Sequence, residues 1–308
     1  MLTRFFGKSN PINFLILSVA VLITYIATVV PMQPETVTFT KIPFHGLLIM
    51  TVVFSVFLLD FLIRKNSLTR VNTYAVLVYV CFLCALPVVY TVPNIVFASV
   101  LLLLAYRRVI SVSTGKNIEK KILDASLYIS VAGLFYFWAV LFFLVLYLAI
   151  ARRAILSFRL LFIPLAGLFA VATLCIAYCL LAHGSLGWLV GRARPVVSFY
   201  FLPYNPVGVL VPLAVLLSLL LWSGIWQLLS LAAVQKKDRF NTVLLLFTLA
   251  VCICIALVGP DKTGAELLFV FVPFSLVATK YIESIKERLF KEAMLWLVVL
   301  MPFIVLFF

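Results

Sequence analysis

The feature that most constrains the fold is a run of 27 residues without a charge, which lies between Asp124 and Arg152. A helix needs about 20 apolar residues to cross a bilayer. The run is therefore too long for one comfortable crossing and too short for two. Whether it crosses once or turns back decides the side of the membrane on which the following half of the chain lies.

The chain as a whole is apolar. Of its 308 residues, 66% are hydrophobic and only 11% are charged, whereas soluble domains carry about 25% charged residues. The mean hydropathy of +1.25 leaves no room for a separate soluble domain. The apolar runs are continuous and lack the alternation of barrel strands. We therefore predict an all-α polytopic transmembrane helical bundle, formed by a single integral membrane domain over residues 1–308.

The net charge of +14 does not indicate nucleic acid, because the basic residues stand in short clusters between apolar runs. That pattern is typical of cytoplasmic loops beside anionic lipid. Membrane lipid is therefore the expected partner. The six cysteines all fall inside apolar runs and are interpreted as small buried hydrophobic residues. We expect no metal site and no cofactor.

The apolar runs predict about nine full spans plus a broken or re-entrant helix pair at 124–151. The nine spans are expected near residues 12–30, 46–63, 73–90, 93–106, 160–181, 207–234, 242–258, 267–284 and 293–308. The first run follows a basic start and lacks a clear small-residue cleavage site. It is interpreted as an uncleaved first helix with the N-terminus in the cytoplasm.

The distribution of lysine and arginine distinguishes the two paths through the uncharged run. A single crossing would place 13 of the 24 basic residues in the cytoplasm, whereas a reversal would place 20 there. The positive-inside rule favours the reversal. We predict the break at Gly133, which precedes an aromatic cluster from Phe135 to Trp138. The alternative is one tilted helix whose first residues lie in the membrane interface.

Asp60 is the charged residue closest to membrane depth. A buried carboxylate of this kind could form a proton or ion site. It stands four residues before Arg64, a spacing at which helical side chains pair. We expect the ion pair.

In the reversed topology, four basic residues lie outside the cytoplasm: Lys41, Arg192, Arg194 and Lys262. The planar fork of arginine suits phosphate or carboxylate. With Tyr200 nearby, such residues could hold the head group of an anionic lipid or of a lipid-linked glycan. The alternative is anchoring in the interface, with the aromatic residues as a belt. The candidate substrate-binding residues are Arg192, Arg194, His183, His45, Lys41 and Tyr204.

The first outer loop contains Glu35. In architecture the chain resembles the membrane glycosyltransferases that use polyprenyl-phosphate sugars, which carry their catalytic acid in this loop. The resemblance makes Glu35 a candidate catalytic residue by position. Glu35 stands alone, whereas that family has further acidic residues beside it, and a structural role for this glutamate is the alternative.

Three strings cover the start, middle and end of the chain: FFGKSNPINF, YRRVISVSTGKNIEKKILDASLYISVAGLFYFWAVLFF and GPDKTGAELLFVFVPFSLVATKYIE. They are similar to an uncharacterised family of polytopic inner-membrane proteins from Bacteroidota. The resemblance implies the inner, cytoplasmic membrane of a Gram-negative bacterium. It implies no activity.

Two classes of function stay open, one enzymatic or transporting and one not. The protein could handle a lipid-linked or anionic envelope substrate at its outer face, by glycan transfer or by flipping. It could instead be a non-enzymatic membrane subunit or scaffold of a larger envelope complex, with other membrane subunits as its partners.

Overall fold

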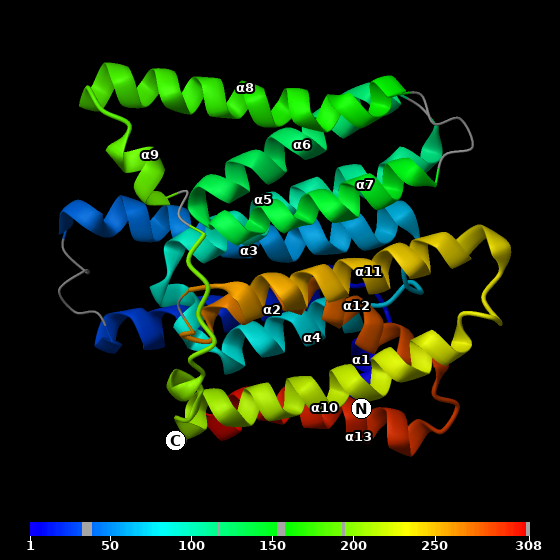
Figure 1. Cartoon of the computed structure of the whole chain (residues 1–308). Coiled ribbons are helices and arrows are strands. Elements are labelled where there is room, and N and C mark those ends of the chain that lie inside the picture. Colours follow the sequence, from blue (N-terminus) through cyan, green and yellow to red (C-terminus); the bar gives the residue numbers. More distant parts are fainter. Residues whose placement is uncertain (33–38, 116, 153–157, 193–194, 261, 306–308) are drawn as a thin grey trace.

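The computed structural model describes residues 1–32, 39–115, 117–152, 158–192, 195–260 and 262–305, and within them it is helical without strands. The long helices run side by side in a parallel and antiparallel bundle (Figure 1). The α-helices are α1 Leu2–Phe5, α2 Pro11–Met32, α3 Ile42–Asn66, α4 Tyr74–Ala85, α5 Pro93–Ser111, α6 Ile118–Phe135, α7 Phe143–Ala151, α8 Phe158–His183, α9 Gly187–Arg192, α10 Val207–Ser230, α11 Lys236–Val258, α12 Leu268–Ser284 and α13 Arg288–Val305.

Seven of the described helices are long and apolar enough to cross a membrane, so the chain is a multi-pass membrane protein. The seven candidate spans are formed by α2, α3, α5, α8, α10, α11 and α12. This number is smaller than the predicted nine full spans. The predicted span at 73–90 is a helix of only 12 residues followed by a 3-10 helix, Pro87–Thr91, because proline forces the preceding residue out of helical geometry. The described part of the predicted span at 293–308 lies in α13, which begins earlier, at Arg288, and therefore contains charged residues in its first turns.

The uncharged run contains a reversal of chain direction. Helix α6 ends at Phe135, Tyr136 is extended, and the chain continues through a 3-10 helix, Phe137–Phe142, into α7. The guanidinium of Arg159 then lies 3.8 Å from the carboxylate of Glu119. Because these two residues precede and follow the run, the chain leaves one end of the bundle and returns to it.

The first arm of the reversal is longer than predicted. Helix α6 starts at Ile118, so it includes the charged turn before Asp124. Its 18 residues rise about 27 Å, close to the thickness of a bilayer core. The uncharged run alone cannot supply two arms of membrane length. The first arm reaches that length because α6 also includes the charged residues before the run.

Helices α4 and α12 form the centre of the bundle. Almost every side chain of α4 is buried, and 83% of the span Ala265–Ser284 is buried, whereas α8 and α10 lie at the periphery with 22%. Phe82 of α4 packs between Phe271 and Phe274 of α12, with ring centroids 5.8 and 5.2 Å apart. A helix that is apolar on all sides is buried by its neighbours.

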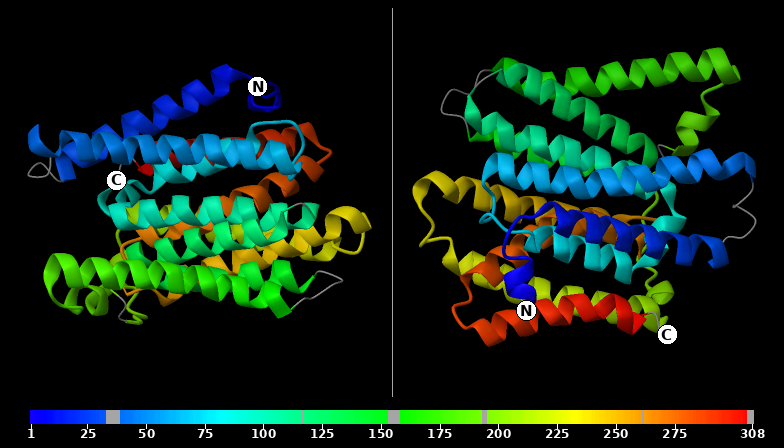
Figure 2. Two further views of the ribbon diagram at one scale, coloured as in Figure 1. Left: turned by 90° about the horizontal axis from the view of Figure 1, so that it is seen from above. Right: turned by 180° about the vertical axis from the view of Figure 1, so that it is seen from behind.

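The bundle has two distinct ends. One end, which we call the basic end, holds the Arg108–Asp124 ion pair at 3.0 Å and Arg152 stacked 3.8 Å from the ring of Phe240. The short helix α1 lies there against α13, as Figure 2 shows, and the backbone amide of Leu2 donates to the Glu292 carboxylate. The opposite end holds the turn before α3 and the turn between α11 and α12.

Candidate functional site

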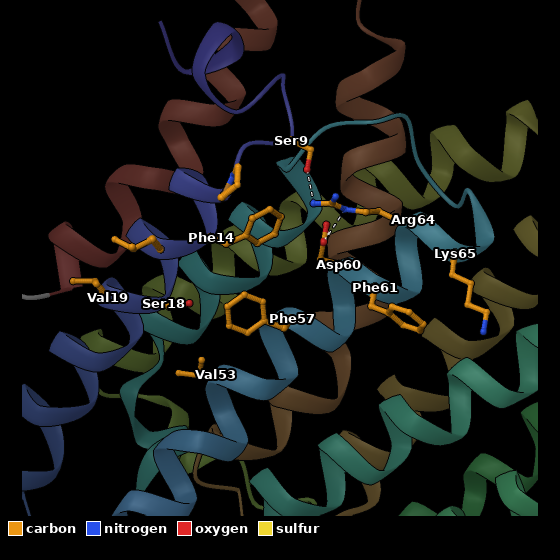
Figure 3. Close-up of a pocket in the computed structure, with 12 residues that line it drawn as sticks. Ser9, Phe14, Ser18, Val19, Val53, Phe57, Asp60, Phe61, Arg64 and Lys65 are labelled. Carbon is orange, nitrogen blue, oxygen red and sulfur yellow. Dashed lines mark hydrogen bonds and ion pairs between the residues drawn. The ribbon is translucent and has the colours of Figure 1, made fainter.

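A groove lies between α2 and α3 (Figure 3). It has a volume of about 940 Å³, and most of its wall is apolar. Phe14 and Val19 line it from α2, and Val53 and Phe57 line it from α3. Such a groove fits a chain of methylene or isoprene groups.

The mouth of the groove is polar and lies at the basic end. Asp60 accepts a hydrogen bond from Nε of Arg64 at 2.8 Å, which confirms the predicted ion pair. Nη2 of the same guanidinium donates to Oγ of Ser9 at 2.6 Å, and Cζ lies 5.4 Å from the ring centroid of Phe14 (Figure 3). These contacts hold the guanidinium in a fixed orientation between the two helices.

Two further cations surround Phe61 at this mouth. Nζ of Lys65 lies 5.4 Å from the ring centroid of Phe61, and Cζ of Arg107 lies 4.6 Å from it. The side chain of Arg64 is 52% exposed, whereas Asp60 is only 15% exposed. The exposed charge at the mouth is therefore mainly positive, and it favours an anionic group.

The deeper part of the groove contains one polar atom that is not satisfied. Oγ of Ser18 lines this part, is buried, and has no hydrogen-bond partner among the described residues. Serine in a helix normally donates to the carbonyl one turn before it. This hydroxyl is available to an ester or carbonyl oxygen of a ligand.

The structure brings two of the predicted substrate-binding residues together at the opposite end. Lys41 and His45 line one cavity of about 350 Å³ with Tyr90. The phenol oxygen of Tyr25 lies 2.9 Å from Nδ1 of His45. The hydroxyl of Tyr90 is buried without a hydrogen-bond partner in the described part of the chain.

His183 does not line that cavity. His183 ends α8, is exposed, and makes an edge contact with Tyr178 at 5.9 Å. Arg192 is the last residue of α9, and its side chain lies outside the described atoms. Glu35 and Arg194 lie outside the described residues.

Tyr204 belongs to a buried polar cluster rather than to an open site. Its hydroxyl donates to Oε1 of Glu266, whose Oε2 accepts from the backbone amide of Gly264 at 3.0 Å. Glu266 is completely buried. Burial and the hydrogen bond to Glu266 raise the pKa of the Tyr204 phenol well above its usual value. The phenol therefore stays protonated and donates.

Lys262 lies beside this cluster and is only 3% exposed. Its ammonium donates to the carbonyl oxygens of Ala256 and Leu257 at 2.7 and 2.6 Å. It thereby caps the C-terminus of α11, where unpaired carbonyls favour a cation. Burial lowers the pKa of Lys262, and the charge of Glu266 opposes this effect. This lysine, predicted as an outer-loop charge, is an internal structural residue.

The helix break lies at Tyr136 and not at Gly133, where it was predicted: Gly133 lies inside α6, three residues before the extended Tyr136. A Cβ at Gly133 would lie 2.8 Å from Cγ2 of Val140, so the glycine allows the returning segment to pack closely. The phenol of Tyr136 in turn lies against Gly259, where a Cβ would be 1.7 Å from its oxygen. The reversal is thus packed against the end of α11.

The sequence model of a family of unknown function, DUF6427, matches residues 5–308. The chain belongs to this family. The predicted membership of an uncharacterised family of membrane proteins is therefore confirmed, and the family brings no activity or site residue. No curated protein and no solved structure matches the chain. Across the described residues, no group of three or more histidine, cysteine, aspartate or glutamate side chains could hold a metal ion.

Proposed function

We propose that this protein is a bacterial inner-membrane protein that binds a lipid-linked or anionic envelope substrate through the groove between α2 and α3. The ligand class is an apolar chain that carries a phosphate. A phospholipid and a polyprenyl-phosphate precursor share this chemistry. The observation that carries the proposal is a long apolar groove that ends at exposed cations.

The length of the groove supports an acyl or prenyl chain as its occupant. From Val53 to Lys65, α3 rises about 18 Å. One leaflet contributes about half of the hydrocarbon core, or roughly 15 Å. The groove therefore fits a chain that belongs to a single leaflet, with its head group at the mouth.

The charge at the mouth supports an anionic head group. Arg64 is oriented by Asp60 and Ser9, and Lys65 is available beside it. The concentration of arginine and lysine at this end favours a cytoplasmic orientation for it, with the N-terminus inside. In that orientation the groove opens toward the cytoplasmic leaflet, where anionic lipids are concentrated.

The test measures lipid binding by the purified full chain in detergent. Fluorescent phosphatidylglycerol, phosphatidylcholine and a polyprenyl phosphate are titrated separately against the wild type and against Val53→Trp. We expect the two anionic lipids to bind more tightly than phosphatidylcholine. The indole in Val53→Trp fills the groove, and we expect it to weaken binding at least tenfold.

The matched control is Met50→Trp, because Met50 lies on the same helix, is 73% exposed and does not line the groove. It should bind as the wild type does. Lys65→Gln should reduce the preference for anionic over zwitterionic lipid. Unchanged binding by Val53→Trp would refute the groove as the site, and equal binding of all head groups would refute the role of the cations.

A second candidate places substrate handling at the outer face, by glycan transfer or flipping. It is favoured by the shared cavity of Lys41 and His45, at the end of the bundle opposite the groove mouth. Lys41→Ala, His45→Ala and Glu35→Ala would be compared in cells at equal expression. Loss of envelope function supports this candidate. Retained function in all three supports the alternative of a non-enzymatic subunit.

A further inference from the structure

A polar cavity of about 450 Å³ lies at the basic end, among α10, α11, α12 and the turn that follows α3. It is separate from the groove, and none of its residues belongs to the sites discussed above. Its position is on the side of Figure 1 where α10 ends and α11 begins. Cavities of a few hundred cubic ångströms with convergent polar groups are typical small-molecule sites.

The cavity has an unpaired polar group in its wall. Gln227 of α10 is only 2% exposed, and its carbonyl oxygen Oε1 is buried without a hydrogen-bond partner among the described residues. Leaving a buried acceptor unpaired costs about 1–3 kcal/mol. A ligand that carries an N–H or O–H donor would satisfy this oxygen.

A cation lies beside it, in the last part of α12. Lys280 belongs to the candidate membrane span Ala265–Ser284, and Nζ donates to Oγ1 of Thr242 at 3.3 Å. Ionisable residues inside a span are costly and face protein or a water-filled cavity. The ammonium can attract a carboxylate or phosphate that enters the cavity.

Carboxylates face the same space. Oε1 of Glu283 accepts from the backbone amide of Arg70 at 3.0 Å and from Nδ2 of Asn72 at 2.5 Å, so its position is fixed. Asp238, at the start of α11, is the second acid of the wall. Among the described lining residues, two cations, Arg70 and Lys280, therefore balance two anions.

From this arrangement we propose that the cavity binds a small zwitterion of the amino-acid type. A wall that is neutral in sum but contains fixed charges of both signs favours a ligand with the same property. Lys280 pairs with the carboxylate of the ligand. Gln227 accepts from its ammonium, and the two acids of the wall stabilise that positive charge. The site is independent of lipid binding in the groove.

The experiment is isothermal titration of the full chain in detergent with the common L-amino acids. Propionate, ethylamine and inorganic phosphate serve as probes that carry only one kind of charge. At least one amino acid should bind and raise the unfolding temperature, while the three single-charge probes should bind at least tenfold more weakly. Absence of binding by every amino acid, or equal binding of propionate or phosphate, overturns the proposal.

Variants then locate the site. Gln227→Leu removes the unpaired acceptor at nearly constant volume, so the ligand-free protein should stay at least as stable as the wild type while affinity falls at least tenfold. Lys280→Met should have the same effect on affinity. Ser223→Ala is the matched control, because Ser223 is a buried polar residue of α10 that does not line the cavity. Binding that persists in Gln227→Leu, or that is lost in Ser223→Ala, overturns the assignment.

Discussion

The close crossing of α6 and α8 gives the sharpest test of the packing. At Gly167 of α8, a Cβ would lie 1.9 Å from Oγ and 2.8 Å from Cβ of Ser126 in α6. Non-bonded carbon atoms pack at about 3.5–4.0 Å. Gly167→Ala must therefore push the helices apart or displace Ser126. Small residues at such crossings are what allows membrane helices to approach closely.

The expected cost follows from these contacts. Overpacking a close-packed interior costs about 1–3 kcal/mol. Ser126 is completely buried, and its hydroxyl donates to the carbonyl of Leu123 at 2.7 Å. Losing that bond adds about 1 kcal/mol. We expect Gly167→Ala to lower the free energy of unfolding by about 2–4 kcal/mol, which corresponds to roughly 5–10 °C in the midpoint of thermal unfolding.

The assay follows tryptophan fluorescence during thermal unfolding of the purified protein in detergent. Gly224→Ala in α10 is the control, because no atom beyond its chain neighbours and its own helix backbone lies within 4 Å of the position that its new methyl group would take. It should leave the midpoint unchanged or raise it slightly, since alanine favours helix over glycine. Adding Ser126→Gly to Gly167→Ala should restore most of the loss. A midpoint for Gly167→Ala equal to that of the control would refute the close crossing.

Three further predictions concern the opposite end and the topology. Gly259→Ala places its methyl group 1.7 Å from the phenol oxygen of Tyr136 and should lower the unfolding midpoint by several degrees, unlike Gly224→Ala. Lys262→Met leaves two carbonyls of α11 without their donor, and it should cost about 1–3 kcal/mol in unfolding experiments. Cysteines introduced at Gln235 and Ser284 of a cysteine-free background should react only with a membrane-permeant reagent in intact cells, and labelling by an impermeant reagent would contradict the proposed orientation.

The path of the chain could be predicted because charge reports on topology over long distances. The count of arginine and lysine favours a return of the chain between Lys121 and Arg152, and the contact of Arg159 with Glu119 places those flanks at one end. The boundaries could not be predicted in this way. The length of an uncharged run shows only where the apolar residues begin and end. Helix α6 begins earlier, at Ile118, and includes a charged turn before that run.

The same contrast applies to the candidate sites. The Asp60–Arg64 pair was predictable because both residues stand on one helix at a fixed spacing. The groove beside that pair was not, because it also requires Ser9 and Phe14 from a different part of the chain. The sequence predicts Tyr204 to be an outer polar residue, yet burial against Glu266 makes it part of the interior.

The polar cavity shows that polar residues inside apolar spans can indicate a buried site in the sequence. Its wall comes from three parts of the chain that lie far apart, residues 67–70, 226–242 and 280–284, so no local spacing could assemble it. Gln227, however, is an amide in a predominantly apolar span whose other polar residues are serines, and an uncompensated amide inside a span needs a partner. Lys280 meets the same condition in α12. Two such residues in neighbouring helices mark a shared polar space, so both the cavity and the groove direct the search for a ligand to the basic end.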